Sequence, residues 1–202
     1  FATDVSVLDD ALRAEFFAAA GDVAFSMVQL IWVDDQWPRL RSALDVLFVA
    51  GGWPMADEHP VPDLWGAIEA FMGEVAKLDG LDPTLTELVR LRGARQHDCR
   101  LCASRRSIAA IDAGADDAMF AAIDRWPESD LPAATKAALG LVDAMIWTPS
   151  AIPADVVAAV HAHLTPAEAV EVVLDVVRNA ANKIAVAFRA DAPEVEGIQL
   201  VP

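Results

Sequence analysis

The amino-acid sequence predicts an all-α fold with no β-sheet. Alanine, the strongest helix former, is abundant, prolines and glycines divide the chain into helix-length segments, and no stretch alternates apolar and polar residues with a period of two. With 55% hydrophobic residues, the 202-residue chain can bury a complete core. We expect one helical domain over residues 1–202, with N-terminal helices over 1–80, a core over 81–190 and a tail over 191–202.

The expected helices begin at capping residues or prolines, and several end at glycines. In the first half of the chain they cover residues 6–20, 22–34, 38–50, 63–78 and 83–96, with a loop over 51–62 after Gly51-Gly52 ends the third helix. Asp98 is expected to cap a helix that runs to about Ala113. The remaining helices are expected over 116–125, 133–147, 154–163 and 166–189, and a capping box formed by Thr165 and Glu168 starts the last one.

The charge of the chain limits its partners and its location. A formal net charge of -16 repels phosphate backbones and anionic lipids, so we expect neither a nucleic-acid partner nor a membrane partner. No basic segment precedes an apolar stretch near the start, so we expect no signal peptide. We also expect that no apolar run is long enough to span a bilayer. We therefore expect a cytoplasmic protein. In that reducing compartment a lone pair of cysteines is more often catalytic than structural.

The only two cysteines, Cys99 and Cys102, stand three residues apart in the segment HDCRLCASRR. With Asp98 as the cap they would occupy the first and fourth positions of a helix, where the helix dipole favours a thiolate. Helical spacing would also place Arg106 on their face. Six of the fifteen Lys and Arg residues fall within seventeen residues here, and their positive charge should favour a thiolate further: Arg90, Arg92, Arg95, Arg100, Arg105 and Arg106.

Three interpretations of the cysteine pair remain open: a redox pair, two small residues packed in the core, or part of a metal site. His97 could join the cysteines as a metal ligand, but a closed zinc site needs four ligands and the chain has no second cysteine pair. Glu87, on the preceding helix, shares a face with apolar residues and is expected to be half buried. It could be a site carboxylate or simply the helix ion-pair partner of Arg90.

The run LDPTLTELVRLRGARQHDCRLCASRRSIAAIDAG, residues 81–114, resembles the core motif of the carboxymuconolactone decarboxylase and alkylhydroperoxidase D superfamily. That motif is a Glu, a Cys twelve residues later, a second Cys three residues on, and a His four residues after that. Glu87, Cys99 and Cys102 match it in type and spacing. The segment VVRNAANKIAVAF, with Asn179 and Asn182, is similar to the last core helix of the superfamily, and the resemblance covers roughly residues 60–190.

The resemblance implies a helical, homo-oligomeric, thiol-dependent peroxidase or disulfide reductase that needs no cofactor and uses a small peroxide or disulfide donor. In such proteins the Glu and the His relay a proton to the second cysteine, which attacks the peroxide, and the first cysteine resolves the sulfenic acid. Here Arg106 stands at the position of the His, and a guanidinium cannot shuttle a proton. We therefore expect a pair between Glu87 and Arg106 within roughly 4 Å, and His97 as a substitute base.

Two other functions remain as alternatives. One is a non-redox enzyme on the same scaffold, acting on a small carbonyl or lactone-like acid, with Glu87 or His97 as the base and Arg106 holding a carboxylate. The other is a non-catalytic helical oligomer whose cysteines only pack or sense. An accessible sulfur would favour the redox function, whereas a deep arginine-lined pocket without one would favour the non-redox enzyme.

Overall fold

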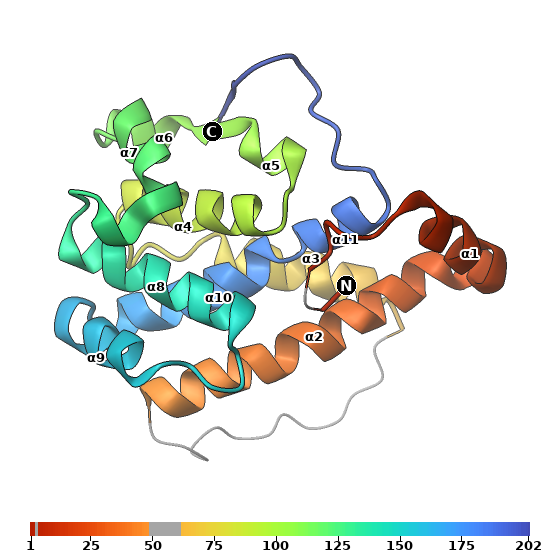
Figure 1. Ribbon diagram of the computed structural model, residues 1–202, viewed down its shortest axis with the longest axis horizontal. Coiled ribbons are helices and arrows are strands. Elements are labelled where there is room, and N and C mark those ends of the chain that lie inside the picture. Colours follow the sequence, from red (N-terminus) through yellow and green to blue (C-terminus); the bar gives the residue numbers. More distant parts are fainter. Residues whose placement is uncertain (3, 49–61) are drawn as a thin grey trace.

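The computed structural model describes residues 1–2, 4–48 and 62–202, and it confirms a mainly all-α fold (Figure 1). The predicted helix end at Gly51-Gly52 and residues 51–61 of the predicted loop lie outside the described residues. In the described part of the chain the α-helices are α1 (Asp10–Ala20), α2 (Ala24–Leu47), α3 (Leu64–Val75), α4 (Pro83–Gln96), α5 (Arg100–Ala103), α6 (Ile108–Asp112), α7 (Asp117–Ala122), α8 (Ala133–Trp147), α9 (Ala154–His163), α10 (Pro166–Asn179) and α11 (Asn182–Ala187). Two 3-10 helices, η1 (Gly21–Val23) and η2 (Ile123–Glu128), join them.

The core lies where α4, α8 and α10 pack against one another, with the long helix α2 against α8, α9 and α10 (Figure 1). Large apolar side chains from these helices are fully buried, among them Leu88, Leu91, Leu139, Leu141, Met145, Val172 and Val173. This packing brings the C-terminal end of α4 next to the junction of α10 and α11, because α4 and α10 lie side by side. The cysteine pair follows directly after α4, so the core positions it against that junction.

Helix α2 runs without interruption through Pro38, whereas the sequence predicted a break between residues 34 and 38. A proline inside a helix removes the hydrogen bond to the carbonyl four residues earlier, here that of Asp34. Asp34 and Pro38 both lie on the exposed side of the helix, so water can solvate the freed carbonyl. Pro38 therefore does not interrupt α2, because the carbonyl that loses its hydrogen bond is accessible to water.

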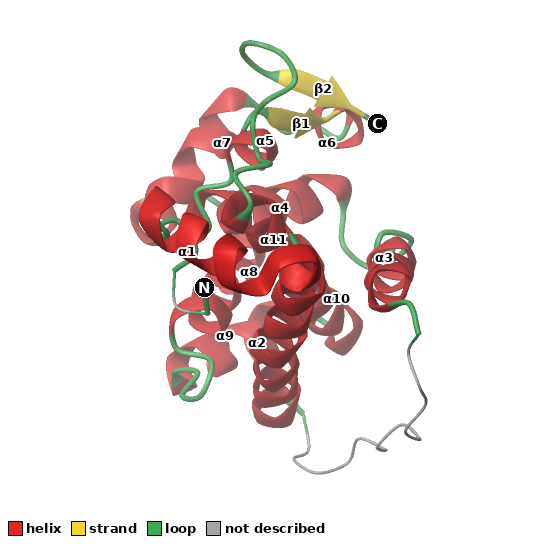
Figure 2. Ribbon diagram, turned by 90° about the vertical axis from the view of Figure 1, so that its right-hand side faces the viewer, coloured by secondary structure: helices red, strands yellow, loops and turns green. Residues whose placement is uncertain are grey.

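The helix predicted over residues 98–113 is divided into α5, the strand β1 (Arg105–Ser107) and α6. Strand β1 pairs in parallel with β2 (Gln199–Val201) from the C-terminal tail, in the register Arg105 to Gln199 (Figure 2). The expectation of no sheet therefore misses this small two-stranded one. Ser107 ends the strand and starts α6, because its hydroxyl oxygen accepts a hydrogen bond from the Ala110 N–H at 3.3 Å.

The helix predicted over residues 166–189 begins as expected, with the capping box of Thr165 and Glu168, but it is interrupted after Asn179. A new helix, α11, begins at Asn182. Ala180 and Ala181 keep right-handed helical backbone angles through the turn, so Asn179 and Asn182, three positions apart, still lie on the same side. Both amide side chains are available to the region around the cysteines.

The N-terminal helices carry a large apolar surface. The stretch Asp10–Leu47 is long and apolar enough to cross a membrane by length and composition, so the expectation that no run reaches that length is wrong by this measure. Core helices and signal sequences share that length and composition. Much of this surface is exposed on α2, where Leu30, Ile31 and Trp37 are large apolar side chains open to solvent.

Candidate functional site

Cys99 and Cys102 form a disulfide at the start of α5. Cys99 is only 1% exposed and belongs to the apolar core, whereas Cys102 is partly exposed. The cap of α5 is Cys99, whose sulfur accepts a hydrogen bond from the Cys102 N–H at 3.2 Å. The predicted cap, Asp98, is instead an exposed residue with a left-handed backbone, φ 51°. The two sulfurs thus differ in access, and one of them already accepts a backbone hydrogen bond.

Asp191 satisfies the two amide groups of α5 that precede Cys102. Its carboxylate accepts from the Arg100 N–H at 3.1 Å, and its backbone carbonyl accepts from the Leu101 N–H at 2.9 Å. The Arg100 guanidinium pairs with the same carboxylate at 2.9 Å. Hydrogen bonding from Arg100 holds the pKa of Asp191 below its usual range. Sequence reasoning assigned this residue to the tail and missed it, because no local pattern links it to a helix 91 residues away.

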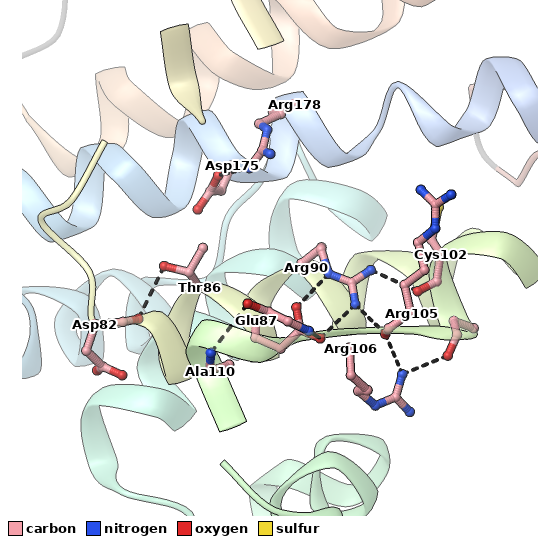
Figure 3. A network of polar contacts seen from close by, with 12 residues as sticks. Asp82, Thr86, Glu87, Arg90, Cys102, Arg105, Arg106, Ala110, Asp175 and Arg178 are labelled. Atoms are coloured by element: carbon pink, nitrogen blue, oxygen red, sulfur yellow. Dashed lines mark hydrogen bonds and ion pairs between the residues drawn. The ribbon is translucent and has the colours of Figure 1, made fainter. Parts of the chain in front are cut away.

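Glu87 and Arg90 connect α4 to the backbone of Cys102 and of the residues that follow it (Figure 3). The buried Glu87 carboxylate binds the Arg90 guanidinium through two bonds of 2.7 and 2.8 Å and accepts from the Ser107 N–H at 3.2 Å. Arg90 donates in turn to the carbonyl oxygens of Cys102 and Arg105, both at 2.8 Å. The alternative of a Glu87–Arg90 pair is thus the one observed. The pair holds the disulfide segment in place.

The expected pair between Glu87 and Arg106 is wrong. Arg106 lies on β1 and not on a helix with Cys102, and its guanidinium donates to the carbonyls of Ala103 and Arg105 at 2.8 and 2.7 Å. It also lies 5.0 Å above the ring of Phe120. Burial lowers the pKa of Arg106, partly offset by the charge of Glu87. Because strand side chains alternate, Arg105 faces the side of Cys102 and Arg106 faces the opposite side.

A pocket of about 220 Å³ opens beside the disulfide, and residues from six elements line it: Arg90, Cys102, Arg105, Asn179, Asn182 and Val201. Asn179 and Asn182 come from the α10–α11 junction, and Val201 comes from the tail strand β2. Of the two bonded cysteines, Cys102 is the one that lines the pocket. Of the residues predicted for the site, Cys102 lines this pocket, whereas Glu87, Arg106, His97 and Cys99 do not.

His97 lies behind the pocket, at the end of α4. It is 5% exposed, and its Nδ1 lies 2.8 Å from the Asn182 Oδ1, so the neutral ring donates from Nδ1. Burial, assisted by the positive charge of Lys183, lowers the pKa of His97 to about 4 although the hydrogen bond to Asn182 opposes the shift. At neutral pH His97 therefore carries no charge. Its link to the pocket is the hydrogen bond to Asn182, which lines the pocket.

The structure offers no support for a metal site in the residues that it describes. Within them, no group of three or more His, Cys, Asp or Glu side chains is arranged to hold an ion. The two cysteines and His97, considered above as metal ligands, have other partners: the cysteines form a disulfide with each other, and His97 forms a hydrogen bond with Asn182.

Two proteins of Mycobacterium tuberculosis are similar to this chain: the uncharacterized proteins MT2376 (strain CDC 1551 / Oshkosh) and Rv2313c (strain ATCC 25618 / H37Rv). Each is 40% identical over 204 residues, which cover 97% of this chain and 72% of the relative. The chain belongs to the family of these mycobacterial proteins. No protein-family model matches the chain, and no solved structure matches it either.

In this family member the two bonded cysteines have unequal surroundings. Cys102 lines the pocket, whereas Cys99 is buried in the core. The Cys102 N–H donates to the Cys99 sulfur. This hydrogen bond would be stronger to a Cys99 thiolate than to the same sulfur in the disulfide, because a charged acceptor strengthens it. The oxygens of Glu87 are occupied by Arg90 and Ser107, so this carboxylate has a positioning role.

Proposed function

We propose that the protein is a thiol–disulfide oxidoreductase in which Cys102 reacts with the substrate and Cys99 is the resolving cysteine. The observation that carries the proposal is the unequal access of the two bonded sulfurs: Cys102 lines a pocket and Cys99 is buried. A packed, inert pair would need no pocket at one sulfur. An accessible thiol beside a resolving thiol is the arrangement that cycles reversibly.

In the reductive half, a donor thiolate attacks the Cys102 sulfur. A new S–S bond forms, the Cys99–Cys102 bond breaks, and its electron pair goes to the Cys99 sulfur. A second donor thiolate then attacks the donor sulfur of this mixed disulfide, which releases the oxidised donor and leaves Cys102 as a thiolate. The Cys102 N–H that faces the Cys99 sulfur stabilises the first leaving group.

In the oxidative half, the Cys102 thiolate attacks one oxygen of a small hydroperoxide, the O–O bond breaks, and the alkoxide takes a proton from water. The resulting sulfenic acid is attacked by the Cys99 thiolate, which re-forms the disulfide and releases hydroxide. The balance is two thiols and one hydroperoxide converted to one disulfide, one alcohol and one water. Since Glu87 is bound to Arg90 and Arg106 cannot relay a proton, this half proceeds without a general base and should be the slower one.

The same proposal places the protein in the cytoplasm as a homo-oligomer. The exposed apolar side of α2, with Leu30 and Trp37, is the surface that a second copy would cover. The net charge of -16 disfavours an anionic membrane as the alternative. A stable interface should bury more than about 2,000 Å² in total. Light scattering at micromolar concentration should give a multiple of the 21.6 kDa chain mass, and a monomer would refute this part.

Alkylation of single-cysteine variants of the reduced protein tests the redox function. Cys99→Ser, which leaves Cys102 at the pocket, should react rapidly with iodoacetamide and form a mixed disulfide with a small disulfide reagent. Cys102→Ser, the matched control, leaves only the buried Cys99 and should react slowly in the folded state. Equal rates in both variants, or a native disulfide that resists excess dithiothreitol until the protein unfolds, would refute the proposal.

A further inference from the structure

Arg105 is one of the two arginines that line the pocket together with Cys102. On β1 it points to the side of Cys102, and across the ladder it pairs in register with Gln199. Val201, two residues further along β2, lines the same pocket, so Gln199 and Val201 share one face of that strand. The small sheet therefore directs Arg105 and Gln199 toward the disulfide, and it directs Arg106 away from it.

Polar atoms on this face lack partners. The Nε of Arg105 and the Oε1 of Gln199 are both buried, and neither has a hydrogen-bond partner among the described residues. The Nη2 of Arg105 donates to Glu194 Oε1 at 3.1 Å, and both side chains of this pair are solvent-exposed, by 34% and 61%. Such an exposed pair is weak and exchangeable. Nε and Nη2 form one edge of a guanidinium, the edge that takes a carboxylate in two parallel bonds, and Glu194 here occupies only half of it.

The rest of the pocket lining carries no negative charge. The residues that line it are two arginines, two asparagines, Cys102 and Val201. Arg90 is neutralised by Glu87, which lies behind it and is buried. Arg105, whose partner Glu194 is largely exposed, thus supplies the more weakly compensated positive charge of the pocket, in a chain whose net charge is -16. The volume of about 220 Å³ is below the range of roughly 300–1,000 Å³ that drug-sized ligands need, so the ligand is small.

We propose that this pocket selects a small thiol, or its disulfide, that bears a carboxylate. The carboxylate displaces Glu194 and binds the Nε–Nη2 edge of Arg105, and the sulfur meets Cys102, with the bonds made and broken as in the reductive half above. This inference rests on the redox function proposed for the same disulfide. It adds the substrate class and assigns Arg105 the role of setting it.

Three small thiols of different charge test the proposal: 3-mercaptopropionate, 2-mercaptoethanol and cysteamine. The second-order rate constant for reduction of the Cys99–Cys102 disulfide is measured for each, and each is divided by its rate with the neutral bis(2-hydroxyethyl) disulfide to remove intrinsic reactivity. The normalised preference for 3-mercaptopropionate over cysteamine should be about tenfold or more, as expected for a charge-assisted pair. The net charge of the chain would favour cysteamine, so the preference has to arise locally.

Arg105→Gln should abolish the preference. Arg106→Gln, which removes the same charge from the opposite side of β1, should retain it, and Glu194→Gln should increase it by freeing the edge of Arg105. Propionate, which has no sulfur, should inhibit reduction by 3-mercaptopropionate in the unmodified protein, a test that needs no variant to fold. Equal normalised rates for the three thiols would overturn the substrate class and leave the redox function standing. A folded disulfide that no thiol reduces would overturn both.

Discussion

Replacing Asp175 with Asn should stabilise the protein at neutral pH. Asp175 lies on α10 with a side chain 3% exposed, and its Oδ2 has no hydrogen-bond partner among the described residues. Burial raises the pKa of Asp175 from 3.8 to about 6, because the Arg178 charge at 3.4 Å offsets it only in part and Glu171 adds repulsion. The folded protein therefore binds this proton more tightly than the unfolded chain does.

The size of the effect follows from the shift. A rise of about 2 units, at 1.36 kcal/mol per unit, corresponds to about 3 kcal/mol. Below pH 3.8 the group is protonated in both states and costs nothing. As the pH rises from 3.8 to 6, the folded state retains the proton that the unfolded state loses, and stability falls. Above pH 6 the full penalty is present, so Asp175→Asn should gain up to about 3 kcal/mol there and almost nothing near pH 4.

Urea unfolding at pH 4 and pH 7.5, with the disulfide kept oxidised, measures this difference. Asp112→Asn, at an exposed aspartate on α6, is the matched control and should change stability by less than about 0.5 kcal/mol at either pH. If Asp175→Asn is less stable than the unmodified protein at pH 7.5, the carboxylate is used in the folded state as an anion. The reasoning from its burial would then be wrong.

Three further substitutions test the site. His97→Asn retains an amide donor for Asn182. In the unmodified protein the free energy of unfolding should decrease as the pH falls from 6.5 to about 4, because only the unfolded chain protonates His97, and the variant should lack this contribution when urea unfolding is measured across that range. Glu87→Gln breaks a buried ion pair with Arg90 and should cost roughly 3 kcal/mol in the same assay. Arg106→His should not raise peroxide turnover, because position 106 faces Phe120; a gain of about 10²-fold, typical of a restored general base, would contradict the geometry.

Two helix starts that depend on residues close in sequence were predicted correctly. The Asp82 cap before Pro83 starts α4, because its carboxylate accepts from the Leu85 N–H three residues on. Thr165 and Glu168 form their capping box in the same local way. These hydrogen bonds form within one turn and need no tertiary partner. The all-α fold follows from many such local preferences acting together.

Features that depend on distant segments could not be predicted in this way. Residues 99–113 have a helical composition, yet the tail strand β2, more than ninety residues later, pairs with Arg105–Ser107 and interrupts the helix. The change from a helical period to a period of two moves Arg106 away from Cys102 and brings Arg105 toward it. The local indication of a new helix start was Ser107, because serine is a favoured N-cap residue and its hydroxyl here accepts from the Ala110 N–H.

The contacts that hold the disulfide segment from α4 and from Asp191 bind its backbone and not its sulfurs. Arg90 binds the Cys102 carbonyl, Glu87 binds the Ser107 amide, and Asp191 binds the first two amides of α5. None of these bonds involves the S–S bond, so reduction should leave all of them in place. The segment would then present Cys102 to the pocket in the same position in both redox states. The proposed redox cycle requires this fixed position, because Cys99 has to remain close enough to Cys102 in the reduced protein for the disulfide to form again.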